Sequence, residues 1–263
     1  MDRVTSDDGT GISFSRTGDG PALVLVHGTG VDRHVWDDVI PALGESFTVF
    51  AIDRRGRGES GDADDYAVGR EFEDLTALAT AVDGPVNLLG HSYGAICAIG
   101  AAPQLPDLRR LILYEPPLWR GDGTSAPSPT PEQRRMEALA ERGEKEAILE
   151  TYWTDLRGEP HRLDRLRSRP DYRRRVSAAH TLPREMGGRR EFRPTPESYP
   201  EVAVPTLLLT GSETDDRIKR SVDAAADLFS DVRRVEIEGH GHAAMNTAPD
   251  RFVAEVIAFL AND

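Results

Sequence analysis

The residues best suited to chemistry lie in the segment NLLGHSYGAICAIG, numbered 87 to 100, where a serine stands between two glycines. An apolar run typical of a buried strand ends at Gly90, and an alanine-rich pattern typical of a helix follows Gly94. Glycines at these positions permit a tight turn that lifts the hydroxyl of Ser92 off the strand end and aims the backbone N–H of Tyr93 into the same space. The pattern G-x-S-x-G therefore predicts an activated nucleophile; the alternative is a turn that only links strand to helix.

A second glycine-rich segment, HGTG at residues 27 to 30, follows another apolar run and precedes a helical pattern. Its glycines let the chain bend, so the backbone N–H of Thr29 can point into the same space as that of Tyr93. Two such donors would stabilise an oxyanion that forms when a hydroxyl attacks a carbonyl group. We predict this oxyanion hole, against the alternative of a plain glycine turn.

A serine hydroxyl is a poor nucleophile until a base removes its proton. Among the seven histidines, His242 in EGHGHAAM follows the last expected strand, on a loop made flexible by glycine. His240 lies two residues earlier and is the alternative base. The pattern G-x-G-H favours His242, because it leaves His240 at the variable position.

Composition narrows the classes of protein to consider. The chain has 263 residues, 38% apolar and 29% charged, which is typical of a globular protein with one large domain or two small ones. Its net charge of −13 argues against a nucleic-acid partner. Its single cysteine, Cys97, forms neither a disulfide nor a cysteine-based metal site, and we expect it to be a packing residue. Without a long apolar run or an apolar leader, we expect no membrane partner and a cytoplasmic location.

Expected strands and helices alternate near both ends of the chain, which predicts a doubly wound, mostly parallel α/β sheet covered by helices on both faces. The expected strands are 11–18, 21–28, 47–53, 85–90, 108–115, 205–211 and 233–239. The expected helices are 32–43, 70–82, 95–102, 218–229 and 248–260.

The alternation breaks over residues 119–200, which contain no convincing strand. A helix is expected to start at Thr130, because Pro131 suits its first position and Gln133 completes a capping box. Further helices are expected over 144–156 and 170–180. We therefore predict that residues 1–118 and 201–263 form one core, with 119–200 inserted as a helical cap.

These motifs, taken in order, resemble the α/β-hydrolase superfamily over nearly the whole chain. HGTG follows one strand, DRRGRGES (53–60) the next, GHSYGA lies at the turn of Ser92, and GHGH stands near the end. The resemblance implies that Ser92 attacks and His242 shuttles the proton, without a metal or a cofactor. It implies that DRRGRGES braces the sheet ends and takes no part in chemistry. It also implies that the cap lies over Ser92 as a lid that shapes an apolar pocket.

The acid that orients the histidine departs from the usual family pattern. Its common place is the third residue after the glycine that ends the penultimate strand, and here that residue is Thr214, with Asp215 one position later. Some relatives, including haloalkane dehalogenases and zearalenone lactonases, carry the acid after the strand that follows the nucleophile's helix. Glu115 stands there in this chain. We predict that Glu115 is the acid, with Asp215 as the alternative, although Asp215 also suits a helix cap.

The resemblance implies a serine hydrolase that cleaves a small to medium apolar carboxylic ester or lactone through an acyl-enzyme. Relatives that carry aspartate at the position of Ser92, the dehalogenases and epoxide hydrolases, are disfavoured. Two enzymatic alternatives use the same triad, namely carbon–carbon bond hydrolysis and cofactor-free perhydrolysis. A third alternative belongs to another class, a ligand-binding receptor with slow turnover.

Overall fold

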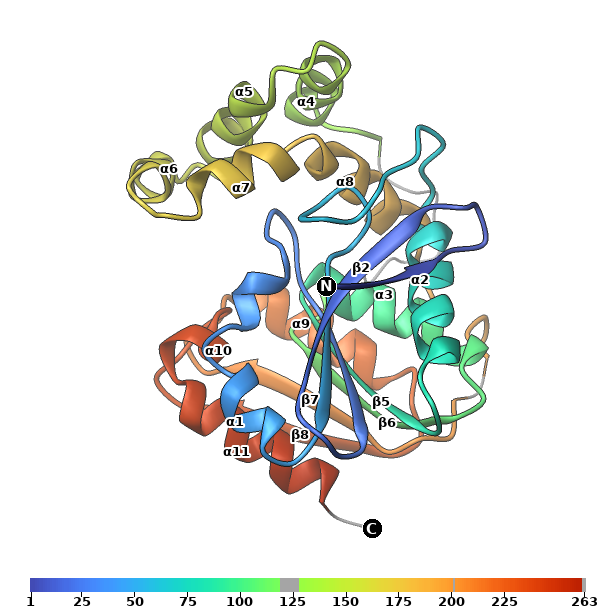
Figure 1. Ribbon diagram of the computed structural model, residues 1–263. Coiled ribbons are helices and arrows are strands. Elements are labelled where there is room, and N and C mark those ends of the chain that lie inside the picture. Colours follow the sequence, from blue (N-terminus) through green and yellow to red (C-terminus); the bar gives the residue numbers. More distant parts are fainter. Residues whose placement is uncertain (119–127, 201, 262–263) are drawn as a thin grey trace.

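A computed structural model describes residues 1–118, 128–200 and 202–261, in which helices cover both faces of one sheet (Figure 1). In these residues the sheet has eight strands, in the order β1-β2-β4-β3-β5-β6-β7-β8. They are β1 (Asp2–Thr5), β2 (Gly11–Thr17), β3 (Ala22–Val26), β4 (Thr48–Ile52), β5 (Val86–His91), β6 (Leu108–Tyr114), β7 (Thr206–Gly211) and β8 (Val232–Ile237). Only β2 pairs antiparallel within this sheet, with β1 and with β4. The predicted mostly parallel sheet is confirmed.

The helices of the core divide between the two faces of the sheet. They are η1 (Arg33–Trp36), α1 (Ile40–Gly44), α2 (Val68–Ala81), α3 (Tyr93–Ala101), η2 (Ala102–Gln104), α9 (Asp216–Ala226), α10 (Ala244–Thr247) and α11 (Pro249–Leu260). On one face α2, α3 and α9 bury residues such as Phe72, Ile96 and Val222. On the other face α1 and α11 bury Leu43 and Phe252. Central strands buried on both faces explain why their sequences are continuous apolar runs.

The strand order brings distant segments to one edge of the sheet. Because β3, β5, β6, β7 and β8 are parallel, their carboxyl ends all lie at that edge. The turn 27–30, Ser92, Glu115, the loop after Gly211 and the loop of His242 follow these five ends. Ligands of open parallel sheets bind at this edge.

Helices lie between β6 and β7 in the chain and pack above the carboxyl edge of the sheet (Figure 1). They are α4 (Pro131–Glu141), α5 (Lys145–Glu150), the π-helix η3 (Thr151–Leu156), α6 (Pro160–Arg167), α7 (Tyr172–Ala178) and α8 (Thr181–Glu191). They share a separate apolar cluster that includes Met136, Ile148 and Leu163. The expected capping box is present, with Thr130 accepting from the backbone N–H of Gln133 and the Gln133 side chain accepting in return. We call these helices the cap.

Some elements differ from expectation. The single helix predicted over 32–43 is wrong: η1 and α1 form instead, because Pro41 lacks the N–H that would continue the first helix. The helix expected over 144–156 changes to π geometry at Thr151. The polar β1 was not expected, and it is held by pairing with β2. The sequence pattern also missed α6 and α8.

Candidate active site

The turn at Ser92 is strained in the manner of a nucleophile elbow. Ser92 has φ 53° and ψ −122°, and among the described residues only it and Glu115 combine a side chain with positive φ. A Cβ on Gly94 would lie 2.2 Å from the carbonyl oxygen of Val26, and one on Gly90 would lie 2.5 Å from that of Gly94. Glycine is therefore required on both sides. Ser92 Oγ forms no hydrogen bond with any described residue, so the hydroxyl has no structural task.

The turn 27–30 lies directly against the elbow. A Cβ built on Gly28 would lie 3.0 Å from Ser92 Cβ, so a side chain there would crowd the elbow. Thr29 follows in the same turn and is partly exposed. Tyr93 is the first residue of α3, where backbone N–H groups have no acceptor inside the helix. The structure thus brings together the segments that carry both predicted oxyanion donors.

Glu115 and His242 form a close side-chain pair at this edge. Nδ1 of His242 lies 2.5 Å from Oε2 of Glu115. The other carboxylate oxygen accepts from the backbone N–H of Gly211 at 2.8 Å and from Thr214 Oγ1 at 2.5 Å. The Glu115 side chain is fully buried, whereas that of His242 is 46% exposed. The base candidate therefore has one nitrogen fixed by a buried carboxylate and a ring face open to a ligand.

The alternative candidates have structural contacts of their own. Asp215 is the N-cap of α9, where its carboxylate accepts from the backbone N–H of Ile218 at 3.0 Å. Nδ1 of His240 lies 2.9 Å from Thr247 Oγ1, not beside a carboxylate. Thr214, at the usual family position of the acid, instead donates to Glu115. The structure therefore pairs His242 with Glu115 and leaves Asp215 outside the pair.

The loop of His242 is clamped by two buried rings that sequence reasoning missed. The Tyr114 hydroxyl donates to the carbonyl of Gly241 and accepts from the backbone N–H of Ala244 at 3.0 Å. Nε2 of His91 donates to the carbonyl of His242 at 2.8 Å, and the two imidazole centroids are 4.6 Å apart. Burial, together with the nearby His242, holds the pKa of His91 well below its usual range. His91 therefore stays neutral and keeps this donor.

Removing the Tyr114 hydroxyl is expected to make the loop that carries His242 less rigid. In Tyr114→Phe, two backbone groups that flank His242 lose their partner, and we expect kcat/KM to fall about tenfold to a hundredfold, with a stability loss of about 1–3 kcal/mol. The matched control is Tyr199→Phe, whose hydroxyl donates to the Ile99 carbonyl at 2.7 Å, away from this edge. The control should lose stability and keep kcat/KM. Equal kinetic losses in the two variants would contradict the clamp.

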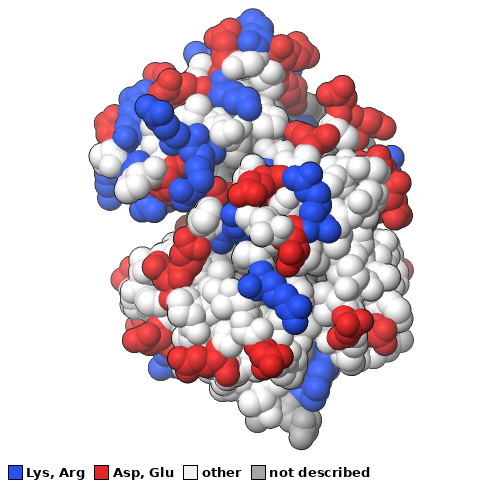
Figure 2. Space-filling model, viewed as in Figure 1, with Lys and Arg blue, Asp and Glu red and all other residues white. Residues whose placement is uncertain are grey.

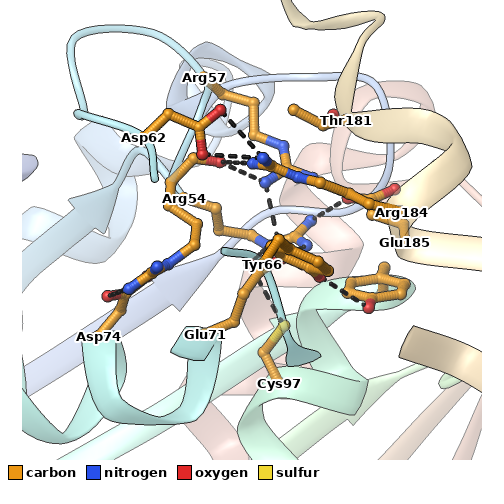
Figure 3. A network of polar contacts seen from close by, with 12 residues as sticks. Arg54, Arg57, Asp62, Tyr66, Glu71, Asp74, Cys97, Thr181, Arg184 and Glu185 are labelled. Carbon is orange, nitrogen blue, oxygen red and sulfur yellow. Dashed lines mark hydrogen bonds and ion pairs between the residues drawn. The ribbon is translucent and has the colours of Figure 1, made fainter. Parts of the chain in front are cut away.

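A buried ion network, drawn in Figure 3, contacts the turn 27–30 through Arg54. The guanidinium of Arg54 donates to both carboxylate oxygens of Glu71, at 2.7 and 2.8 Å. It also donates to the carbonyl of Gly28 at 3.1 Å and pairs with Glu185 of α8 at 2.9 Å. Arg57 pairs with the same Glu185. DRRGRGES thus does more than brace strand ends, because it fixes the turn of the predicted oxyanion hole and ties the cap to the core.

Breaking this network should destabilise the protein. Burial alone would raise the pKa of Glu71, but the charges of Arg54 and Arg57 hold it well below its ordinary value of 4.5. We expect Glu71→Gln to cost about 3 kcal/mol at neutral pH, because it leaves a buried guanidinium poorly compensated. A depressed pKa stabilises the fold above pH 4.5, and this contribution is lost as the pH falls through the folded-state pKa. The difference from wild type in urea unfolding should therefore shrink as the pH is lowered.

The control for this prediction is Glu73→Gln, the same chemical change on the same helix. Glu73 pairs with Arg70 at 2.9 Å, and both side chains are about one-third exposed. Partly exposed pairs contribute little to stability. A loss in Glu73→Gln as large as that in Glu71→Gln would argue against the buried network.

Cys97 is buried, and burial raises the pKa of its thiol. Across the described ranges, no three or more His, Cys, Asp or Glu side chains are grouped as a metal site would require. No helix in the described part of the chain has the length and apolar character needed to cross a membrane.

Strand order, elbow and paired residues together define the α/β-hydrolase class. The model of the alpha/beta hydrolase family matches residues 23–255, and the chain belongs to this family. Among solved structures, an alpha/beta hydrolase from Sphaerobacter thermophilus is 31% identical, with a TM-score of 0.85, covering 98% of this chain and 100% of that one. The enol-lactonase from Burkholderia xenovorans has a TM-score of 0.72 over 99% of this chain and 100% of its own, but at 21% identity it shares the fold alone.

Curated relatives match over shorter stretches. An N-formylmaleamate deformylase from Pseudomonas putida is 42% identical over 119 residues, which are 43% of this chain and 44% of that protein. A pimeloyl-[acyl-carrier protein] methyl ester esterase from Neisseria meningitidis is 35% identical over 90 residues, which are 34% of this chain and 28% of that protein. The chain thus spans less than half the length of the curated relatives that it matches.

Proposed function

We propose that the protein is a serine hydrolase that cleaves a carboxylic ester or lactone through an acyl-enzyme. The observation that carries the proposal is the pair of His242 with buried Glu115 beside the strained elbow of Ser92. Membership of the hydrolase family supports the reaction type. The methyl ester esterase among the relatives supports the substrate class.

In the proposed mechanism, Nε2 of His242 takes the proton of Ser92 as Oγ attacks the substrate carbonyl carbon. Contacts between nucleophile and base commonly tighten only when substrate is bound. The backbone N–H groups of Thr29 and Tyr93 donate to the oxyanion of the tetrahedral intermediate, and the imidazolium then protonates the leaving alcohol. Glu115 keeps a proton on Nδ1 throughout, so that Nε2 is free to accept.

The second half of the reaction repeats these steps with water. His242 deprotonates a water molecule, which attacks the acyl carbon of the Ser92 ester. The intermediate collapses, Ser92 regains its proton from the imidazolium, and the carboxylic acid leaves. For a lactone, the leaving alcohol remains part of the same product molecule.

The proposal is tested by active-site titration followed by a substrate panel. A chromogenic short-chain ester should give a burst of about one equivalent and then continued turnover, with the acyl group found on Ser92 by mass spectrometry. Esters and lactones should be hydrolysed and the diketones of the panel should not. A burst without turnover would favour the receptor, and cleavage of diketones alone would favour carbon–carbon bond hydrolysis.

A further inference from the structure

One face of α8 contacts the turn 27–30 of the candidate active site and the arginine that holds it. Leu182, Glu185 and Arg189 stand at positions i, i+3 and i+7 of this helix and therefore share a face. The Cδ2 atom of Leu182 lies 3.5 Å from the Cβ position of Gly30, in the turn of the predicted oxyanion hole. Glu185 pairs with Arg54, which holds the same turn. Arg189 continues this face, one turn further along the helix.

The residue before Arg189 sets how close this turn of α8 lies to the elbow. A Cβ on Gly188 would lie only 2.4 Å from the hydroxyl oxygen of Tyr93, the residue after Ser92. The backbone that carries Arg189 therefore packs directly on the elbow's tyrosine. The opposite face of α8, with Gly187, borders a separate cavity of about 370 Å³ that does not include Ser92.

Arg189 is a largely buried cation without an anion. Its Nε is buried and has no hydrogen-bond partner, and no described carboxylate lies within ion-pairing distance of its guanidinium. Burial lowers the pKa of Arg189, and the charges of Arg217 and Arg157 lower it further. A buried charge is costly until a partner meets it. An anion bound between α8 and α9 would supply that partner.

The neighbouring cations come from two other elements. Arg217 lies in the first turn of α9, is exposed, and forms no ion pair with a described residue. Arg157 ends η3 and reaches Glu159 only at 3.9 Å. The charges of Arg157, from the cap, and Arg217, from the core, thus both act on the guanidinium of Arg189.

The charge of the cap surface also favours a bound anion. Between residues 160 and 178 there are seven arginines and two acidic residues, in a chain whose net charge is −13. Figure 2 shows Lys and Arg gathered over α6 and α7, with Asp and Glu prominent on the core below. Such a field draws small anions toward the cap and away from the core.

We propose that the substrate carries a free carboxylate, which Arg189 binds together with Arg217 while Ser92 attacks the ester or lactone carbonyl elsewhere in the same molecule. The inference rests on the proposed function, since it names the substrate class of that site. The planar guanidinium group of arginine matches a carboxylate through two parallel hydrogen bonds. The substrate class is therefore half-esters of dicarboxylic acids, or lactones that bear a carboxylate.

The kinetic test compares monomethyl esters of dicarboxylic acids with methyl esters of monocarboxylic acids of matched chain length. Wild type should prefer the best half-ester by about tenfold to a hundredfold in kcat/KM, the effect of a charged hydrogen-bonded pair. Arg189→Met should abolish this preference, and Arg189→Lys should recover part of it. Arg173→Met is the matched control, because Arg173 is an exposed cap residue, and it should keep the preference.

A binding test separates this inference from the proposed function, because it needs no turnover. In titration calorimetry, adipate should bind to the Ser92→Ala protein. The double variant Ser92→Ala/Arg189→Met should bind adipate at least tenfold more weakly. The double variant Ser92→Ala/Arg173→Met should bind adipate as tightly as Ser92→Ala does. Hydrolysis of both ester series with no preference for half-esters would overturn the carboxylate site and leave the hydrolase intact. Binding of adipate through Arg189 without hydrolysis of any ester or lactone would uphold the site and overturn the hydrolase.

Discussion

Replacing Ser92 by alanine is expected to lower kcat on any hydrolysed ester by about a millionfold, the loss seen when a serine nucleophile is removed from a working triad. The acyl-enzyme can no longer form, so neither half of the proposed reaction can proceed. The donors of the oxyanion hole remain, and they should leave a small residual rate above that of water. The measurement is steady-state hydrolysis of a chromogenic ester at high enzyme concentration.

The same substitution should hardly change the melting temperature. Ser92 Oγ forms no hydrogen bond with a described residue, and alanine meets the same backbone strain at φ 53°. The contrasting control is Ser60→Ala, because the Ser60 hydroxyl donates to the Asp53 carbonyl at 2.5 Å and accepts from the Ser13 N–H at 2.8 Å. That variant should lose stability and keep kcat. Turnover retained in Ser92→Ala would remove the mechanism altogether.

Local sequence patterns predict the sheet and the elbow well, because the physics involved is local. β3 is buried on both faces and is apolar throughout, and the buried β5 has an apolar centre at Leu88 and Leu89. The elbow needs glycine two residues on either side of Ser92, and the structure shows backbone atoms where side chains would stand. The capping box at Thr130 is another interaction between near neighbours in the chain. Each of these features can be predicted from residues that are close together in the sequence.

The partners of buried charges cannot be predicted from such local patterns. Nothing near Arg54 in the sequence points to Glu185, which comes from a cap helix. That helix, α8, contains Pro183 and two adjacent glycines, so its sequence favours a helix weakly. Its close packing on Tyr93 nevertheless requires a small residue at Gly188. Tertiary contacts with the core, rather than helix propensity, explain why it forms.

The choice between Glu115 and Asp215 as the acid that orients His242 also depends on contacts that local sequence patterns do not show. Both follow strands at the correct edge, and both keep the order serine, acid, histidine. The sequence favoured Glu115 because a triad is defined by geometry rather than by sequence position. The contacts that distinguish Glu115 from Asp215 in the structure join residues about a hundred positions apart. Thr214 and Gly211 donate to one oxygen of Glu115, and His242 meets the other.

The second large effect is expected for Glu115→Gln, which should lower kcat by about 10⁴. An amide keeps the volume of the carboxylate, and its oxygen can still accept from Gly211 and Thr214. Its NH₂ group then faces Nδ1 of His242, where a carboxylate oxygen stood. Nδ1 must now accept a hydrogen bond, so the proton moves to Nε2. An imidazole that carries its proton on Nε2 cannot take one from Ser92.

Asp215→Asn is the matched control, because it makes the same carboxylate-to-amide change in the loop after the neighbouring strand β7. Asparagine caps a helix as well as aspartate does, so α9 should keep its N-terminus and the protein its stability. We expect kcat within a fewfold of wild type. The two variants are compared by kcat on one ester, with the melting temperatures measured alongside. A loss of several orders of magnitude in Asp215→Asn, with Glu115→Gln still active, would transfer the orienting role to Asp215. Loss in Glu115→Gln alone, in a protein that still folds, would tie the rate to the tautomer of His242.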